Sequence, residues 1–172
     1  MLSKNIETAL NKQIRIEAES SQTYLSMACW AEVHGLEGIS NFMYAQSDEE
    51  RAHMLKLIKY VNERGGAATI TELKAPKTKY NTFQEMFEEL HKHELFVSES
   101  INELVHITFE EKDYATHNFL QWYVSEQIEE EAQAKTILDK INLIGDDKGG
   151  LYLFDRDIQQ ISITSAIMDP AK

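Results

Sequence analysis

The chain has 172 residues, of which 42% are hydrophobic and 27% charged, and its formal net charge is −12. This length suffices for one domain with a hydrophobic core. The negative charge argues against binding to nucleic acid or to anionic membranes and makes cations, metals included, the more natural partners. An acidic surface that serves solubility alone is the plainer interpretation of the charge. Only 7 Gly and 2 Pro occur, which favours long helices over short strands.

The single cysteine and the start of the chain bear on the cellular compartment. Cys29 can form neither an internal disulfide nor a cysteine-based zinc or iron–sulfur site. Its apolar surroundings predict a buried structural thiol. The opening residues MLSKNIETAL lack the apolar region of a secretory signal, and no apolar run reaches the ~18 residues of a membrane span. We therefore expect a soluble, cytoplasmic protein.

Apolar residues at helical spacing extend over four long segments of the chain. The first runs from about Ser3 to His34, with Ser3 as its N-cap and Gly35 at the position after the helix end. The second runs from about Ile39 to Arg64 and is ended by the glycines at 65 and 66. A short break joins these two helices, which predicts an antiparallel hairpin.

A long segment, residues 65–81, separates this hairpin from the rest of the chain. Extended, it covers roughly 55 Å, whereas a helix as long as the second spans about 40 Å. The segment can therefore return along the bundle and start the third helix parallel to the second. That helix is expected to begin after Asn81 or Thr82, where Thr82 and Glu85 have capping-box spacing.

The fourth helix is expected from about Asp113 to Ile144, and a shorter helical pattern that includes Ile161 follows over about 148–163. The predicted fold is all-α and forms one domain over residues 1–172. It consists of a four-helix bundle over 3–145, one long crossover between helices two and three, and a short fifth C-terminal helix.

On each of the four long helices the apolar residues form a stripe along one face, and polar residues interrupt each stripe near the middle of its helix. The interrupting residues are Glu17 on the first helix, Glu50 and His53 on the second, Glu94 on the third, and Gln127 and Glu130 on the fourth. Glu17 and His53 lie equally far from the turn at Gly35. Glu94 and Glu130 lie nearly equally far from the turn near Glu111. The spacing therefore predicts a cluster of four carboxylates, one imidazole and one amide in the middle of the bundle.

Four uncompensated carboxylates in a dry core would be very costly, and two divalent cations would neutralise them. Oxygen and imidazole ligands suit Fe(II) or Mn(II). Glu50 can bridge two metals, and His53, one helical turn later, can ligate one of them. The same Glu-x-x-His spacing recurs at 88–91 and 103–106. Those pairs lie off the inward stripe and are interpreted as solvated or intersubunit pairs.

Four stretches carry a family resemblance: RIEAESSQTYLSM, SDEERAHMLKL, HKHELFVSESIN and WYVSEQIEEEAQ. Over essentially its whole length the chain resembles the bacterial non-haem ferritins, members of the diiron carboxylate bundles. The resemblance implies two iron ions at a ferroxidase centre within one subunit. The residues that match the ligands of the first ion are Glu17, Glu50 and His53. Those that match the ligands of the second are Glu50, Glu94 and Glu130, with Glu50 as the bridge.

The resemblance also implies a third iron site and redox-active neighbours. The residues that match the third site are Glu49, Glu126, Glu129 and Glu130. Gln127 matches an amide placed beside the centre, and Tyr24 matches a tyrosine that supplies an electron. Trp122 is similarly placed, and core packing is the alternative interpretation for both aromatic residues.

The resemblance implies a ferroxidase that oxidises Fe(II) with dioxygen or peroxide and stores ferric oxyhydroxide inside a hollow 24-subunit homo-oligomer. The fifth helix would line its fourfold axis. Haem is not expected, because Arg51 replaces the methionine that ligates haem in bacterioferritins, and the fourth helix has no second Glu-x-x-His motif. Two alternatives stay open: a non-catalytic cage subunit, which the complete ligand set disfavours, and another diiron oxidase or peroxidase that forms no cage.

Overall fold

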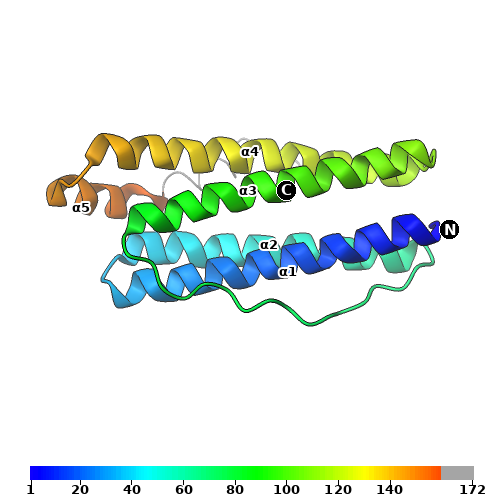
Figure 1. The fold of residues 1–172 in the computed structure, drawn as a ribbon, viewed down its shortest axis with the longest axis horizontal. Coiled ribbons are helices and arrows are strands. Elements are labelled where there is room, and N and C mark those ends of the chain that lie inside the picture. The colour runs from blue at the N-terminus through cyan, green and yellow to red at the C-terminus, as the bar shows by residue number, and fades with distance from the viewer. Residues whose placement is uncertain (160–172) are drawn as a thin grey trace.

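The computed structural model describes residues 1–159 as an elongated helical bundle (Figure 1). Its helices are α1 (Lys4–Val33), α2 (Glu37–Glu63), α3 (Phe83–Glu110), α4 (Tyr114–Ile144) and α5 (Lys148–Asp157). The all-α prediction of four long helices and a short fifth one is confirmed. Ile161, expected in the fifth helix, lies outside the described residues. None of the helices within residues 1–159 combines the length and hydropathy of a membrane span.

The helix ends follow the capping signals in the sequence. The Ser3 hydroxyl accepts a hydrogen bond from the Ile6 N–H at 3.1 Å, and the Thr82 hydroxyl accepts one from the Glu85 N–H at 3.0 Å. Gly35 has a positive φ of 73°, a conformation that glycine adopts without strain. α2 begins at Glu37, two residues before the predicted Ile39, and its N-cap residue Leu36 makes no side-chain capping bond that the sequence could have revealed.

The crossover runs the length of the bundle beside α1, so that α3 runs parallel to α2, as predicted (Figure 1). The Asn11 side chain holds it: Nδ2 donates to the Ala67 carbonyl at 3.0 Å, and Oδ1 accepts from the Thr69 N–H at 2.6 Å. Further along, the Ser26 hydroxyl donates to the Lys77 carbonyl at 2.8 Å. These bonds satisfy backbone groups that have no helical partner.

The α5 helix packs against the start of α2. A Cβ atom at Gly38 would lie 1.6 Å from the Asp155 carbonyl oxygen, so only glycine permits this approach. The Asp155 carboxylate also accepts from the Ile39 N–H at 2.9 Å, which caps the first turn of α2 across the bundle.

Two apolar clusters fill the interior. One, near α5, contains Phe42, Phe87 and Ile137, and the other, towards the opposite end, contains Leu57 and Ile101. The polar residues that interrupt the four stripes lie between these clusters in sequence on every long helix. The bundle is therefore divided by a polar layer at mid-height.

The prediction for Cys29 is wrong, because the thiol is exposed. Ala28 and Ala31 of the same helix are fully buried. The apolar run around Cys29 therefore covers both faces of α1, and the helical period turns the cysteine outward.

Candidate metal centre

The polar layer is built from residues that are almost wholly removed from solvent. Glu17 on α1 and Glu50 on α2 are each 1% exposed, and His53, one turn beyond Glu50, is 3% exposed. Glu94 on α3 is 1% exposed and Glu130 on α4 is 8% exposed. Each long helix thus contributes at least one buried acid to the layer.

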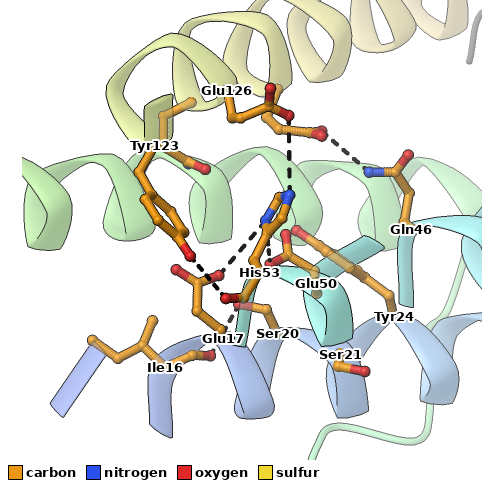
Figure 2. A network of polar contacts seen from close by, with 12 residues as sticks. Ile16, Glu17, Ser20, Ser21, Tyr24, Gln46, Glu50, His53, Tyr123 and Glu126 are labelled. Carbon is orange, nitrogen blue, oxygen red and sulfur yellow. Dashed lines mark hydrogen bonds and ion pairs between the residues drawn. The ribbon is translucent and has the colours of Figure 1, made fainter. Parts of the chain in front are cut away.

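Glu17, Glu50 and His53 converge on one point (Figure 2). His53 Nδ1 lies 3.4 Å from Glu50 Oε2 and 3.9 Å from Glu17 Oε2. One possible ligand atom from each of the three residues lies within 4.8 Å of the other two. Both Oε2 atoms are buried and accept no hydrogen bond. Buried carboxylate oxygens without donors are costly, and a bound cation would neutralise them.

Burial dominates the protonation equilibria of the layer. It raises the pKa of Glu50 to about 7 and that of Glu94 to about 8. The pKa of Glu17 is raised well above its ordinary value by burial and then by repulsion from Glu50. The pKa of Glu130 is raised in the same way by burial and by the neighbouring Glu94. A cation bound here competes with protons for these carboxylates.

Glu94 lies beside this group and has partners for both oxygens. The Tyr24 hydroxyl donates to its Oε1, and Gln127 Nε2 donates to its Oε2 at 3.2 Å. The Gln127 amide also contacts the Ser98 hydroxyl at 3.3 Å. Glu130 accepts from Gln46 Nε2 at 3.1 Å. Tyr24 and Gln127 therefore both donate hydrogen bonds to Glu94.

A second group of possible ligand atoms comprises Glu49, His53 and Glu126. His53 Nε2 lies 4.0 Å from Glu126 Oε2, so the two ring nitrogens face different acids (Figure 2). The sequence did not predict that His53 joins this group. Glu129 is exposed, and neither group of possible ligands within the described residues contains Glu129 or Glu130.

Aromatic residues enclose His53 on the α4 side. The Trp122 ring stands edge-on to the imidazole, with centroids 5.1 Å apart, and Lys56 Nζ lies 3.1 Å from the centre of the indole ring. The Tyr123 hydroxyl donates to the His53 carbonyl at 2.8 Å and so ties α4 to α2 (Figure 2). These contacts hold the His53 ring and backbone in place against α4.

Two amides that orient the acids were not predicted from the sequence. Gln13 Nε2 donates to Glu17 Oε1 at 2.8 Å, and Gln46 holds Glu130 as described above. Gln46 belongs to the inward stripe of α2, and Gln13 precedes Glu17 by one turn of α1. An amide one turn before an acid on the inward face is the signal that could have identified Gln13, whereas Gln46 meets Glu130 on a different helix and leaves no such signal.

Comparisons with known proteins show which family the chain resembles. Residues 7–144 match a family model described as a ferritin-like domain of the ferritin family. The chain is 46% identical to a probable bacterial non-heme ferritin-like protein of Haemophilus influenzae, over 94% of this chain and 98% of that protein. It is 44% identical to a bacterial non-heme ferritin of Campylobacter jejuni, over 95% of this chain and 98% of the relative.

A solved structure has the same fold. The open-pore ferritin of the archaeon Archaeoglobus fulgidus superposes with a TM-score of 0.91 at 42% sequence identity, over 92% of this chain and 98% of that one. The sequence match and the superposition both span nearly the entire chain. The chain belongs to the ferritin family.

Proposed function

We propose that this protein stores and detoxifies iron: it binds Fe(II) in the polar layer, oxidises it, and deposits the ferric product inside a shell of identical subunits. The proposal agrees with the names of the relatives, which are non-heme ferritins. Fe(II) is the substrate and dioxygen or peroxide is the electron acceptor. Each Fe(II) ion gives up one electron, and the resulting Fe(III) hydrolyses to ferric oxyhydroxide.

One observation carries the proposal: two buried carboxylate oxygens, from Glu17 and Glu50, approach His53 Nδ1 and accept no hydrogen bond. Two carboxylates and one imidazole suit Fe(II) better than a soft cation. The low solvent exposure of the layer strengthens the attraction between these acids and a divalent ion.

The other acids complete two binding positions in the proposal. Glu17, Glu50 and His53 hold the first Fe(II), and Glu50 bridges to a second that Glu94 and Glu130 hold. Burial in one layer and the mutual repulsion of these acids support the assignment. A pair of metals in a dry site stabilises charge on a shared oxidant.

Residues around the pair support electron transfer and a third ion. Tyr24, hydrogen-bonded to Glu94, is proposed to supply an electron, and Gln127 to orient the oxidant or a water molecule. Glu49 and Glu126, with Glu129 and Glu130, are proposed as a third site through which iron leaves the centre. The proximity of Glu49 and Glu126 to His53 Nε2 supports this route.

The shell is proposed to contain 24 subunits in the cytoplasm. Large apolar side chains are exposed on the isolated chain, among them Val33 at 85%, Leu143 at 89% and Tyr152 at 68%. Exposed apolar side chains of this size are typical of surfaces that become buried between subunits. In the proposed shell, α5 lines the fourfold axis.

The experiment that tests the proposal is aerobic addition of Fe(II) to the purified protein, followed by absorbance near 310 nm, with Glu50→Ala in parallel. We expect rapid oxidation by a shell of roughly half a megadalton. The initial rate should fall about 100-fold in the variant, because a shared ligand is lost. Gel filtration should give the same size for both proteins. A dimer-sized protein would favour another diiron oxidase, and oxidation indifferent to Glu50 would refute the site.

A further inference from the structure

Glu17 lies at the end of a hydrogen-bonded chain that reaches the neighbouring helix. The Ser100 hydroxyl on α3 donates to Gln13 Oε1 at 2.7 Å, and Gln13 Nε2 donates to Glu17 Oε1 at 2.8 Å. Gln13 and Glu17 are each 1% exposed, so water does not compete for the bond between them, whereas the bond from Ser100 is only partly buried. The two hydrogen bonds together connect Ser100 of α3 to Glu17 of α1.

These hydrogen bonds leave the two oxygens of Glu17 in different environments. Oε1 accepts from Gln13, whereas Oε2 accepts no hydrogen bond and lies 3.9 Å from His53 Nδ1. The amide donates only to the oxygen on its own side. It therefore holds the carboxylate so that the other oxygen faces the Glu50–His53 pair.

The orientation of the Gln13 amide is itself determined by its two neighbours. A flipped amide would set its carbonyl oxygen against Glu17 Oε1, and two acceptors would repel each other. The observed orientation also offers Oε1 to the Ser100 hydroxyl. Ser100 thus stabilises the arrangement in which Gln13 donates to Glu17.

A surface pocket lies beside the hydrogen bond from Gln13 to Glu17. The pocket, of about 200 Å³, lies between α1 and α3, and Gln13, Ser100 and Glu103 are among its lining residues. Gln13 therefore separates an open pocket from a buried acid. Without the amide, Glu17 could turn its carboxylate towards the pocket and the solvent.

We propose that Gln13 is a positioning residue: with Ser100 behind it, it holds Glu17 so that Oε2 is presented to the first bound Fe(II). The inference rests on the proposed function, since it assigns a role to a neighbour of a proposed iron ligand. Partners that orient a metal ligand typically contribute 10- to 100-fold to metal affinity. The effect of Gln13 should therefore appear in binding before any chemistry occurs.

The test compares Gln13→Met with the unmodified protein by anaerobic Fe(II) calorimetry and by the dependence of the aerobic initial rate on Fe(II). Methionine fills the same space, which keeps water from entering through the pocket. We expect Fe(II) affinity to fall about tenfold and the half-saturating Fe(II) concentration to rise equally. The limiting rate should change less than twofold, because the amide contacts a ligand and not the oxidant.

A matched control exists on α3. Gln84 Nε2 donates to Glu88 Oε1 at 3.0 Å with the same four-residue spacing, but this pair is exposed. Gln84→Met should change neither affinity nor rate. Melting curves of all variants show whether folding is intact.

Ser100→Ala gives a second, independent readout. Alone, it should weaken Fe(II) binding about two- to threefold, in line with the modest value of one neutral hydrogen bond. Added to Gln13→Met, it should have no further effect, because Ser100 acts through Gln13. Additive losses, or unchanged affinity in Gln13→Met, would overturn the inference. If the unmodified protein fails to bind Fe(II), the proposed function fails. If it binds Fe(II), Glu17→Ala does not, and Gln13→Met binds as tightly as the unmodified protein, only the role of Gln13 is wrong.

Discussion

Two polar clusters of this bundle contain acids that are withdrawn from solvent, but they are balanced differently. Near the end of α2, the Arg64 guanidinium donates to both oxygens of Asp113 at 3.2 Å. The Thr116 hydroxyl donates to the same carboxylate at 2.7 Å, and the Tyr60 hydroxyl donates to Thr116 at 2.9 Å. This Arg64 cluster supplies its own cation. In the mid-bundle layer, by contrast, Glu17 Oε2 and Glu50 Oε2 accept no hydrogen bond.

The pKa values reflect this difference. Burial alone would raise the pKa of Asp113, but bonds from Thr116 and Arg64 outweigh it, and the pKa is lowered. Burial raises the pKa of Glu50 to about 7, and repulsion from Glu49 and Glu126 acts in the same direction. An acid that is satisfied by its own protein stabilises the fold. An acid left unsatisfied indicates a ligand that arrives from solution.

The largest expected effect comes from removing the charge of Glu50. Glu50→Gln should weaken binding of Zn(II), a redox-inert probe, about 100-fold by calorimetry, because an amide is a poor metal ligand. The same change should raise the melting temperature of the metal-free protein at pH 8. Because the pKa of Glu50 in the folded state is raised to about 7, the folded protein loses stability as pH rises through that value. A glutamine at this position does not ionise, so the variant does not lose this stability.

Asp113→Asn is the matched control in the Arg64 cluster. It makes the same carboxylate-to-amide change at an acid that already has a cation. We expect it to lower the melting temperature at pH 8 and to leave Zn(II) binding unchanged. If Glu50→Gln also lowered the melting temperature of the metal-free protein, Glu50 would be a structural acid and the contrast between the clusters would be wrong.

The second effect comes from removing the cation of the Arg64 cluster. Arg64→Leu leaves Asp113 partly buried without its partner and should cost about 2 kcal/mol of stability. Calorimetric melting of the metal-free protein measures this loss. Arg64→Lys keeps the charge but not the two-pronged geometry, so the loss should be smaller. Fe(II) oxidation should be normal in both variants, and a slowed rate would show that the two clusters are coupled.

The remaining effect is the pH dependence of cation binding. The pKa values of Glu50 and Glu94 are about 7 and about 8, so protons occupy these carboxyls in mildly acidic solution. Each displaced proton makes affinity rise about tenfold per pH unit below the pKa. Zn(II) affinity should therefore increase from pH 6 to pH 8. A flat profile would mean that the acids are already ionised without metal.

Much of this architecture could be predicted from spacing. The interruptions at Glu17, Glu50, Glu94 and Glu130 fall on inward faces because the helical period leaves no other choice, and all four are buried. The crossover was predictable from its length, and the capping residue Thr82 from its type. These features depend on order along the chain alone.

Other features depend on contacts between distant segments. Asp155 caps α2 across the bundle, and Gly38 is required because the backbone of α5 lies against it. None of these contacts leaves a periodic pattern in the sequence.

The sequence by itself determined the helices, their connection and the level at which the acids meet, because local hydrogen bonding and the period of the helix set them. Only the tertiary structure decided which carboxylate oxygens lack donors. Gln13 holds one oxygen of Glu17, Gln46 holds Glu130, and His53 lies between two acidic groups. Such pairings depend on side-chain conformations in the packed interior, where a shift of about 1 Å makes or breaks a hydrogen bond.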